Sequence, residues 1–351
     1  MKVKTLLVDS SFLLKRSFHG AKNVYTDYGH IGGLYQFFTK LRSLIKENQI
    51  NKVVLAWDGE NGGLYRHNID PAYKANRKDK KWNEKIELTP YELKKEKEKD
   101  ESILKQRKRI QEYAEELFFR QIEVENIEAD DLIAAYCLTY HNKENILLYT
   151  NDRDFSQLLD LNIQIKFDNI DIIIDRDSFF LKFPFYYKNA LTMKIICGDS
   201  ADNIKGIEGL KEKTLMKYFP ELKERYVSVR EICNKAIEIN KERVNNKKKP
   251  LAALSKLVEG IDRLKINHQL INLRNPLLND EAEEELDILS YPLSDEDRGA
   301  KNLMNMMNED QFLYVYDGNF VNYVEPFYPV IMNERKLLKE YKKNRKKQLK
   351  G

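Results

Sequence analysis

The sequence has few of the features that mark secreted, membrane-embedded or disordered chains. Its three cysteines, Cys137, Cys197 and Cys233, are too scattered for a disulfide framework or a zinc site with C-x2-C spacing. No apolar run approaches the roughly 20 residues of a membrane span, and the first apolar run, 3–8, is too short for a signal peptide. Proline and glycine are scarce, at 9 and 14 residues, so most of the chain should fold. We expect a globular cytoplasmic protein with no membrane segment.

Acidic residues are placed unusually, because they stand at the edges of apolar segments in five separate places. The nine acids concerned are Asp9, Asp58, Glu128, Asp130, Asp131, Asp152, Asp154, Asp199 and Asp202. Each has an ordinary explanation when taken singly: Asp130 and Asp131 could cap a helix, and Asp152 and Asp154 could form a turn. Five such places in one chain are harder to explain in this way.

Apolar runs near 4–8, 53–57 and 146–150 predict strands, and the alternation within 163–167 predicts another. Helical patterns such as 34–45 separate them, so we expect an α/β fold with a central mostly parallel sheet and flanking helices. The carboxyl ends of parallel strands line one edge of a sheet, where ligands bind. The acids at the strand ends should therefore converge there.

The second half of the chain has a different pattern. Helix signals dominate 208–273, which predicts a mainly helical C-terminal lobe, and the aromatic run 312–316 resembles a strand that enters a turn. We divide the chain into an α/β core at 1–200, a helical lobe at 201–334 and a basic tail at 335–351. The tail contains nine Lys or Arg and one acid, although the whole chain has a net charge of only +4, so the remaining residues are net negative.

The acids indicate a metal site for phosphate chemistry. Mg²⁺ prefers oxygen ligands, and two such ions about 4 Å apart can activate water and stabilise the leaving oxygen of a phosphodiester. Nine carboxylates supply two sites and their surroundings, whereas none of the five histidines is paired at metal-ligand spacing. A basic surface around this acidic pocket would suit a polyanionic substrate.

Six motifs carry a family resemblance and occur in family order over roughly residues 5–215. They are Leu7-Val8-Asp9, Trp57-Asp58-Gly59, Arg66 with Tyr73-Lys74-Ala75-Asn76-Arg77, Glu128-Ala129-Asp130-Asp131, Asp152-Arg153-Asp154 with Gln157-Leu158, and Gly198-Asp199 with Asp202-Asn203-Ile204. On these residues the chain resembles the 5′-nuclease superfamily, which includes flap endonucleases, the 5′-to-3′ exonuclease domain of bacterial DNA polymerase I and T-even phage ribonuclease H. Among the members of this superfamily, the chain most resembles the T-even phage ribonuclease H.

The resemblance implies a PIN-like 5′-nuclease core in which the nine acids hold two Mg²⁺ ions, for which Mn²⁺ could substitute. Tyr73, Lys74 and Arg77 match residues that grip and polarise the scissile phosphate; without the resemblance, an exposed basic helix is the better interpretation of their segment. The Lys/Glu-rich stretch at about 78–110 lies where the family places a helical arch over the active site. From its charge pattern alone, a solvated mixed-charge helix is equally possible.

The segment 206–214 resembles the family's helix-hairpin-helix element, whose amides bind duplex phosphates and which could hold K⁺. It departs from the family pattern, because Lys211 replaces a common glycine and Lys205 a usual proline. The residues that we expect to bind nucleic acid are Arg66, Lys80, Lys81, Lys205, Gly206, Gly209, Lys211, Lys213 and Thr214.

The resemblance implies a 5′-3′ exonuclease or flap endonuclease, ribonuclease H-like, that removes RNA primers or flaps in DNA replication. Its partners would be branched or 5′-ended duplex DNA and RNA–DNA hybrids. The basic tail could hold the duplex backbone, dock on an acidic single-stranded-DNA-binding protein or be a plain solvated tail. We expect a monomer in the cytoplasm, that of the host if the chain is phage-encoded. The alternative is a catalytically weak structure-specific DNA-binding protein.

Overall fold

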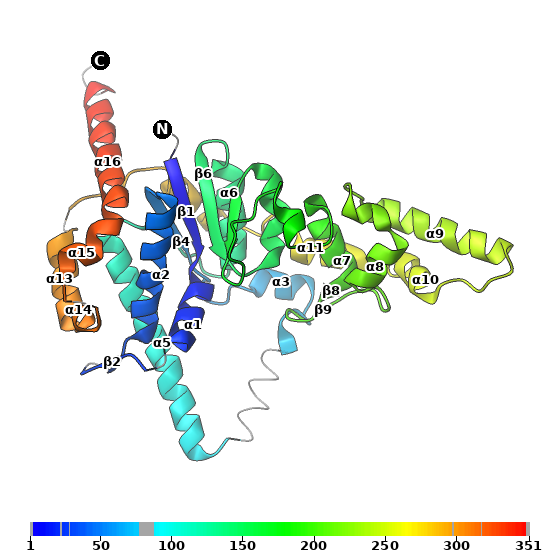
Figure 1. Cartoon of the computed structure of the whole chain (residues 1–351), viewed down its shortest axis with the longest axis horizontal. Helices are drawn as coiled ribbons and strands as arrows, with labels where there is room; N and C mark the ends of the chain where they lie inside the picture. Colours follow the sequence, from blue (N-terminus) through cyan, green and yellow to red (C-terminus); the bar gives the residue numbers. More distant parts are fainter. Residues whose placement is uncertain are drawn as a thin grey trace.

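A parallel sheet of five strands lies at the centre of the protein (Figure 1). The structure, a computed structural model, describes residues 3–21, 23–27, 29–76, 88–296, 298–316 and 318–348. In spatial order the strands are β5 (Arg120–Ile122), β4 (Lys52–Ala56), β1 (Val3–Asp9), β6 (Glu144–Thr150) and β7 (Gln164–Phe167), and neighbours pair in parallel. The α/β prediction and its strands are confirmed. The prediction misses β5, because the polar residues Arg120 and Gln121 interrupt its apolar pattern.

Helices cover both faces of the sheet, because the strands are apolar on both sides. Leu6 and Val8 of β1 belong to the core on one face, and Leu7 belongs to the core on the other. The helices on the first face include α1 (Ser10–Gly20), α2 (Gly32–Asn48) and α5 (Pro90–Glu116), and those on the second include α6 (Ala129–Tyr140) and the 3-10 helix η1 (Arg153–Leu161). This burial explains why the strands read as continuous apolar runs.

A smaller helical lobe follows the sheet and has a core of its own. It contains α7 (Ala190–Cys197), the hairpin β8 (Gly198–Asp199) and β9 (Ile204–Lys205), α8 (Glu212–Tyr218), the 3-10 helix η4 (Pro220–Lys223), α9 (Val229–Asn245), α10 (Ala252–Glu259) and α11 (Ile261–Ile271). Ile196, Leu215, Ile232 and Leu257 are buried in this core. The helical pattern predicted for 208–273 is confirmed.

The residues after 279 return to the sheet and do not extend the helical lobe. They form α12 (Asp280–Ile288), α13 (Ala300–Glu309), α14 (Phe312–Val315), α15 (Phe320–Val324), the 3-10 helix η5 (Glu325–Phe327) and α16 (Tyr328–Gln348). Leu286 joins the core beside α6, and Met307 and Phe327 join the core beside α2. The range 201–334 that we predicted as one lobe is therefore split between two cores.

The predicted strand at 312–316 is wrong, because these residues form the short helix α14. Phe312 is fully buried and packs against Tyr35 and Tyr113, whereas Tyr314 is 93% exposed. One aromatic face of the segment thus packs on the neighbouring helices, and this tertiary contact overrides the strand propensity of the run.

The remaining elements are short and connect the larger ones. They are β2 (Tyr25–Thr26), β3 (Gly29–His30), α3 (Leu64–Ile69), and the 3-10 helices η2 (Phe179–Leu181) and η3 (Tyr187–Asn189). Helix α5 starts with a capping box between Thr89 and Glu92, so the described part of the predicted arch is helical. In the described part of the chain, no helix is long and apolar enough to cross a membrane.

Candidate active site

The carboxylate of Asp9 joins the ends of two neighbouring strands. Asp9 is the last residue of β1, and one of its oxygens accepts a hydrogen bond from the Phe12 amide at 3.0 Å, which caps α1. Its other oxygen accepts from the hydroxyl of Thr150, the last residue of β6, at 3.1 Å. The side chain is only 8% exposed, so it lies at the bottom of the site.

Asp58 brings the start of α6 to the same edge. It follows β4, and its carboxylate accepts from the amide of Ala129, the first residue of α6, at 3.0 Å. Glu128 is the residue at the N-cap position of α6, but it makes no side-chain capping bond there. A residue 71 positions away in the chain thus caps this helix, and the acids of 128–131 are left to make other contacts.

Glu128 is surrounded by positive and donor groups from the segment after α3. Arg66 donates to it at 2.7 Å, the Tyr73 hydroxyl donates at 3.0 Å, and the ammonium group of Lys74 forms an ion pair with it. Tyr73 is only 3% exposed, so its ring is not available for stacking on a base in this conformation. Burial and the nearby charge of Glu128 raise the pKa of Tyr73, which keeps the hydroxyl a donor.

Arg66 and Asp131 are turned toward each other inside the protein. The Arg66 guanidinium donates to both Asp131 oxygens, at 3.0 Å to one of them, and to the carbonyl of Leu270 at 2.8 Å. Asp131 also accepts from the Leu277 amide at 3.0 Å. Both side chains are buried, so Arg66 is corrected from a residue that contacts nucleic acid to one that holds the site together.

Lys194 of α7 lies between two of the predicted acids. Its ammonium group is 2.6 Å from Asp154 and 2.7 Å from Asp199. Asp152 accepts from the Asp154 amide at 2.7 Å, which fixes the turn that presents both carboxylates. The sequence motifs do not include Lys194, although a single lysine within the apolar run 190–197 is a signal that could have indicated it.

The turn between β8 and β9 docks on the segment that carries Lys74. The amide of Lys74 donates to the carbonyl of Asp202 at 2.8 Å, and the Asn203 side chain donates to the carbonyl of Ala72 at 2.8 Å. Lys74 itself has a φ of +52°, a conformation that is uncommon for a residue with a side chain. The contact therefore fixes the ammonium group of Lys74 beside Glu128.

The acids that the sequence places at one edge influence one another's ionisation. Burial, followed by the charges of Asp58 and Asp152, raises the pKa of Asp9 to about 7. Burial and the charge of Asp152 raise the pKa of Asp154 to about 7. Burial and the charges of Asp152 and Asp9 raise the pKa of Asp130 well above its ordinary value. Negative charge is thus in excess at this edge, which favours a bound cation.

The present side-chain positions do not enclose an ion. Over the residues that the structure describes, no group of three or more Asp, Glu, His or Cys side chains is arranged to hold a metal. Lys74, Lys194 and Arg66 are instead the counter-charges of the acids. The donor set still has the chemistry of a hard cation site, since all nine candidates are carboxylates.

Helix α5 is tied to the site at its base. Arg107 donates to the carbonyl of Asp58 at 2.9 Å, and its guanidinium lies 5.2 Å from the centre of the Trp57 ring. A groove of about 1090 Å³ runs between α5 and the β2–β3 hairpin, and Lys95, Lys99 and Lys105 line it. The predicted arch residues 78–87, with Arg77, Lys80 and Lys81, lie outside the described residues.

The predicted helix-hairpin-helix segment forms a tight turn after β9. A Cβ atom on Gly206 would lie 2.2 Å from the Cys197 carbonyl oxygen, and Gly209 has a φ of +83°, so both positions require glycine. Lys205, Lys211 and Lys213 are exposed around this turn, and Thr214 is half-buried. The binding roles predicted for these residues stay predictions.

Comparison with known proteins connects this geometry to a family. The family described as 5′-3′ exonuclease, N-terminal resolvase-like domain, matches residues 4–184. The 5′-3′ exonuclease of Mycoplasmopsis pulmonis is 28% identical over 73% of this chain and 80% of its own length. The 5′-3′ exonuclease of Halalkalibacterium halodurans is 25% identical over 78% of this chain and 91% of its own length.

Solved structures share the fold at lower sequence identity. The zinc-bound T5 5′-exonuclease has a TM-score of 0.64 and 19% identity, over 82% of this chain and 98% of that one. The catalytic core of Rad2 in complex with a DNA substrate has a TM-score of 0.52 and 13% identity, over 94% of this chain and 93% of that one. The phage origin stays a prediction, since the two exonucleases matched by sequence are bacterial and the T5 enzyme shares the fold at only 19% identity.

Proposed function

The chain belongs to the 5′-3′ exonuclease family and is a 5′ nuclease, and from this premise we propose that it hydrolyses phosphodiesters near 5′ ends with the help of two Mg²⁺ ions. The observation that supports the metal most directly is the meeting of acids from β1, β4, α6, β6 and the β8–β9 turn. Burial and mutual repulsion raise the pKa of Asp9 and of Asp154 there, so the folded site favours an added cation. Mn²⁺ could substitute because it accepts the same oxygen ligands.

Two groups of acids would hold the ions, directly or through water. One group contains Asp9, Asp58, Glu128, Asp130 and Asp152, and the other contains Asp154, Asp199 and Asp202. When bound, the ions would activate water and neutralise charge on the leaving oxygen. Asp131 would act from behind the first group, because it neutralises Arg66 and holds the Leu277 backbone.

The protein's own cations would bind and orient the substrate phosphate. Lys74 and Lys194 each have an ammonium group among the acids, and each could exchange a carboxylate partner for a phosphate oxygen. Tyr73 would hold Glu128 in place through its hydroxyl. Arg77 follows Lys74 closely in the chain, and we propose that it contacts the same phosphate.

The substrates would be branched or 5′-ended duplexes, including RNA–DNA hybrids, and the cellular role would be removal of primers or flaps during replication in the cytoplasm. The T5 flap endonuclease of similar fold was solved in a pseudo-enzyme–product complex with DNA and metal ions. The exposed lysines near the 206–214 turn support a duplex contact, and K⁺ binding at that turn stays part of the proposal. A monomer would suffice for this reaction.

The experiment that tests the function uses a 5′-labelled flap and an RNA-primed duplex with Mg²⁺ or EDTA. We expect cleavage only with Mg²⁺, and its loss in Asp154→Asn. The matched control is Asp171→Asn, because Asp171 also follows β7 but its side chain is exposed. This variant should cleave like wild type. Tight flap binding without turnover in any divalent ion would refute the proposal and favour the catalytically weak DNA-binding alternative.

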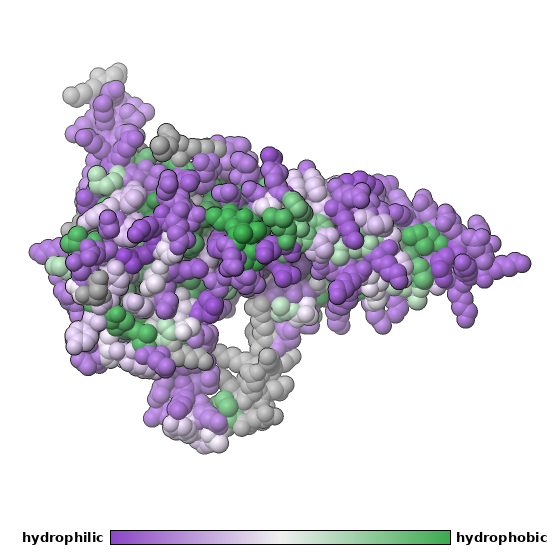
Figure 2. Space-filling model, in the orientation of Figure 1, coloured by the Kyte–Doolittle hydropathy of each residue, from purple (hydrophilic) through white to green (hydrophobic). Residues whose placement is uncertain are grey.

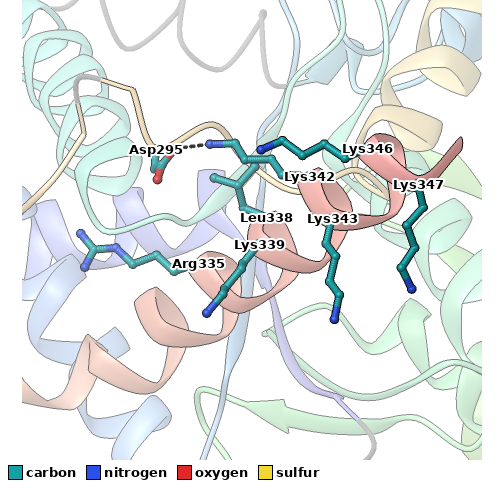
Figure 3. A pocket seen from close by; sticks show the side chains of 8 residues that line it. All are labelled: Asp295, Arg335, Leu338, Lys339, Lys342, Lys343, Lys346 and Lys347. Carbon is teal, nitrogen blue, oxygen red and sulfur yellow. Dashed lines mark hydrogen bonds and ion pairs between the residues drawn. The ribbon is translucent and has the colours of Figure 1, made fainter. Parts of the chain in front are cut away.

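The basic half of α16 is proposed to dock an acidic segment of a single-stranded-DNA-binding protein. Figure 3 shows Lys339, Lys343, Lys346 and Lys347 projecting from this helix, with Lys342 paired to Asp295. In Figure 1 this end of α16 lies on the side where β1 begins, whereas the acids lie where β1 ends. The position supports a partner contact more than contact with the strand being cut.

A further inference from the structure

An arm made of α9, the loop 246–251 and α10 projects from the helical lobe, away from the sheet (Figure 1). Its 17-residue helix α9 is about 25 Å long at the usual helical rise. Ile232 and Ala236 in the inner half of α9 are buried in the core of the lobe, and Ile239 packs against it. Near the end of the helix Val244 is 55% exposed, so the last turn projects into solvent.

The tip of the arm has a defined backbone in spite of its exposure. Asn240 accepts from the Leu251 amide at 2.8 Å and donates to the Ser255 hydroxyl at 3.1 Å, which joins α9 to the start of α10. The amide of Lys248 donates to the carbonyl of Arg243 at 2.8 Å, which closes the end of α9. The backbone positions of the residues at the tip are therefore set by the fold.

The tip is strongly basic. The segment 241–249 contains one acid, Glu242, and five basic residues: Lys241, Arg243, Lys247, Lys248 and Lys249. The three consecutive lysines are exposed, and within the described ranges none of them forms an ion pair. Like charges held together without counter-ions repel one another, and a polyanion would remove this repulsion.

Lysines nearer the base of the arm are paired, unlike those at the tip. Lys235 lies 2.6 Å from Glu221, and Lys256 lies 2.6 Å from Glu208. The positive charge left for a ligand is thus concentrated at the far end. In Figure 2 the surface of the arm is mostly hydrophilic, with a small hydrophobic area.

The start of α10 packs directly on the turn that contains Gly206 and Gly209. A Cβ atom on Gly209 would lie 3.1 Å from the Cβ of Ala253 in α10, and the Lys256–Glu208 ion pair joins the two segments. The turn and the arm therefore form one continuous surface. Ala253 is four residues from Lys249 and six from Lys247, which an extended chain spans in at most about 14 Å and about 22 Å. A duplex held at the turn would therefore reach these lysines within about 6 base pairs, at about 3.4 Å each.

We propose that this arm is a second duplex-binding surface, on which Lys247, Lys248 and Lys249 contact the phosphate backbone a few base pairs from the turn. The proposal rests on the proposed function, because it takes the turn as the nearer duplex contact. The contact carries no sequence preference, since it reads only phosphate charge.

The test compares wild type with the triple variant Lys247→Ala/Lys248→Ala/Lys249→Ala. Binding to flap DNA with a duplex arm of about 20 base pairs is measured in EDTA, so that no turnover is needed. We expect the slope of log K against log salt to become shallower by about 2 to 3 in the variant, because each phosphate that a lysine neutralises adds about 0.9 to it.

The matched control is Lys343→Ala/Lys346→Ala/Lys347→Ala on α16, which removes the same charge elsewhere. It should leave the slope unchanged. Equal slopes for wild type and the arm variant would overturn the proposal, as would an equal decrease in the α16 control. Cleavage of the same flap DNA with Mg²⁺ is followed in parallel, so failure of the proposed nuclease function is recognised separately.

Discussion

The ammonium group of Lys194 lies 2.6 Å from the carboxylate of Asp154, at a point where two distant parts of the chain meet. Asp154 follows β6 and Lys194 belongs to α7, at the start of the helical lobe. The same ammonium lies 2.7 Å from Asp199. One lysine thus holds two predicted metal ligands together.

The substitution Lys194→Met should destabilise the metal-free protein by roughly 1–3 kcal/mol, because two partly buried carboxylates lose their counter-charge. Saturating Mg²⁺ should reduce this loss, since the ion supplies the missing positive charge. Urea unfolding in EDTA and in Mg²⁺ measures both values. An equal loss of unfolding free energy in EDTA and in Mg²⁺ would show that a bound Mg²⁺ ion does not replace the charge of Lys194.

The substitution Arg66→Met should cost about 3–5 kcal/mol of stability, because Asp131 and Glu128 would remain buried without their partner. Flap binding by the folded protein in EDTA should change little, since Arg66 is only 5% exposed. Lys205→Met, on the exposed side of β9, is the control. It should leave the stability unchanged and weaken flap binding. If Arg66→Met were stable but bound DNA poorly, the buried role assigned to Arg66 would be refuted.

Asp168→Asn should lower the free energy of unfolding at neutral pH, and should lower it much less in acid. Burial alone would raise the pKa of Asp168, but hydrogen bonds from Tyr149 and Arg16 outweigh it and lower this pKa. A carboxyl with a lowered folded-state pKa stabilises the fold above its unfolded pKa, roughly 3.9, and this stability is lost as the pH falls through the folded pKa. Urea unfolding from about pH 7 to about pH 3 should show the wild-type advantage shrinking. A constant difference would contradict this assignment.

Glu334→Gln should destabilise the packing of α16 on the sheet. Glu334 is 1% exposed and accepts from the Arg120 guanidinium at 2.6 and 2.9 Å. Loss of the charge should cost about 3–5 kcal/mol, because Arg120 would remain charged and buried. Thermal unfolding measures the loss, with exposed Glu340→Gln as a control that should be neutral. A neutral Glu334→Gln would show that this pair does not hold the helix.

The sequence predicted the sheet and the edge where the acids meet, because both depend on local pattern. Apolar runs buried on two faces show where strands lie, and acids at their ends must share an edge in a parallel sheet. Asp9 and Asp58 illustrate this, since Asp9 ends β1 and Asp58 follows the end of β4 by two residues. The aromatic run 312–316 illustrates the limit, because its partners Tyr35 and Tyr113 lie far away in the chain.

The sequence alone determined which residue types gather at the site, since spacing along strands and helices is a local property. Only the tertiary structure decided what each charge faces. Asp131 faces Arg66, and Lys194 joins Asp154 to Asp199, because packing of the helical lobe on the sheet brings these side chains together. Such pairings depend on contacts across long stretches of chain, which no periodic pattern encodes.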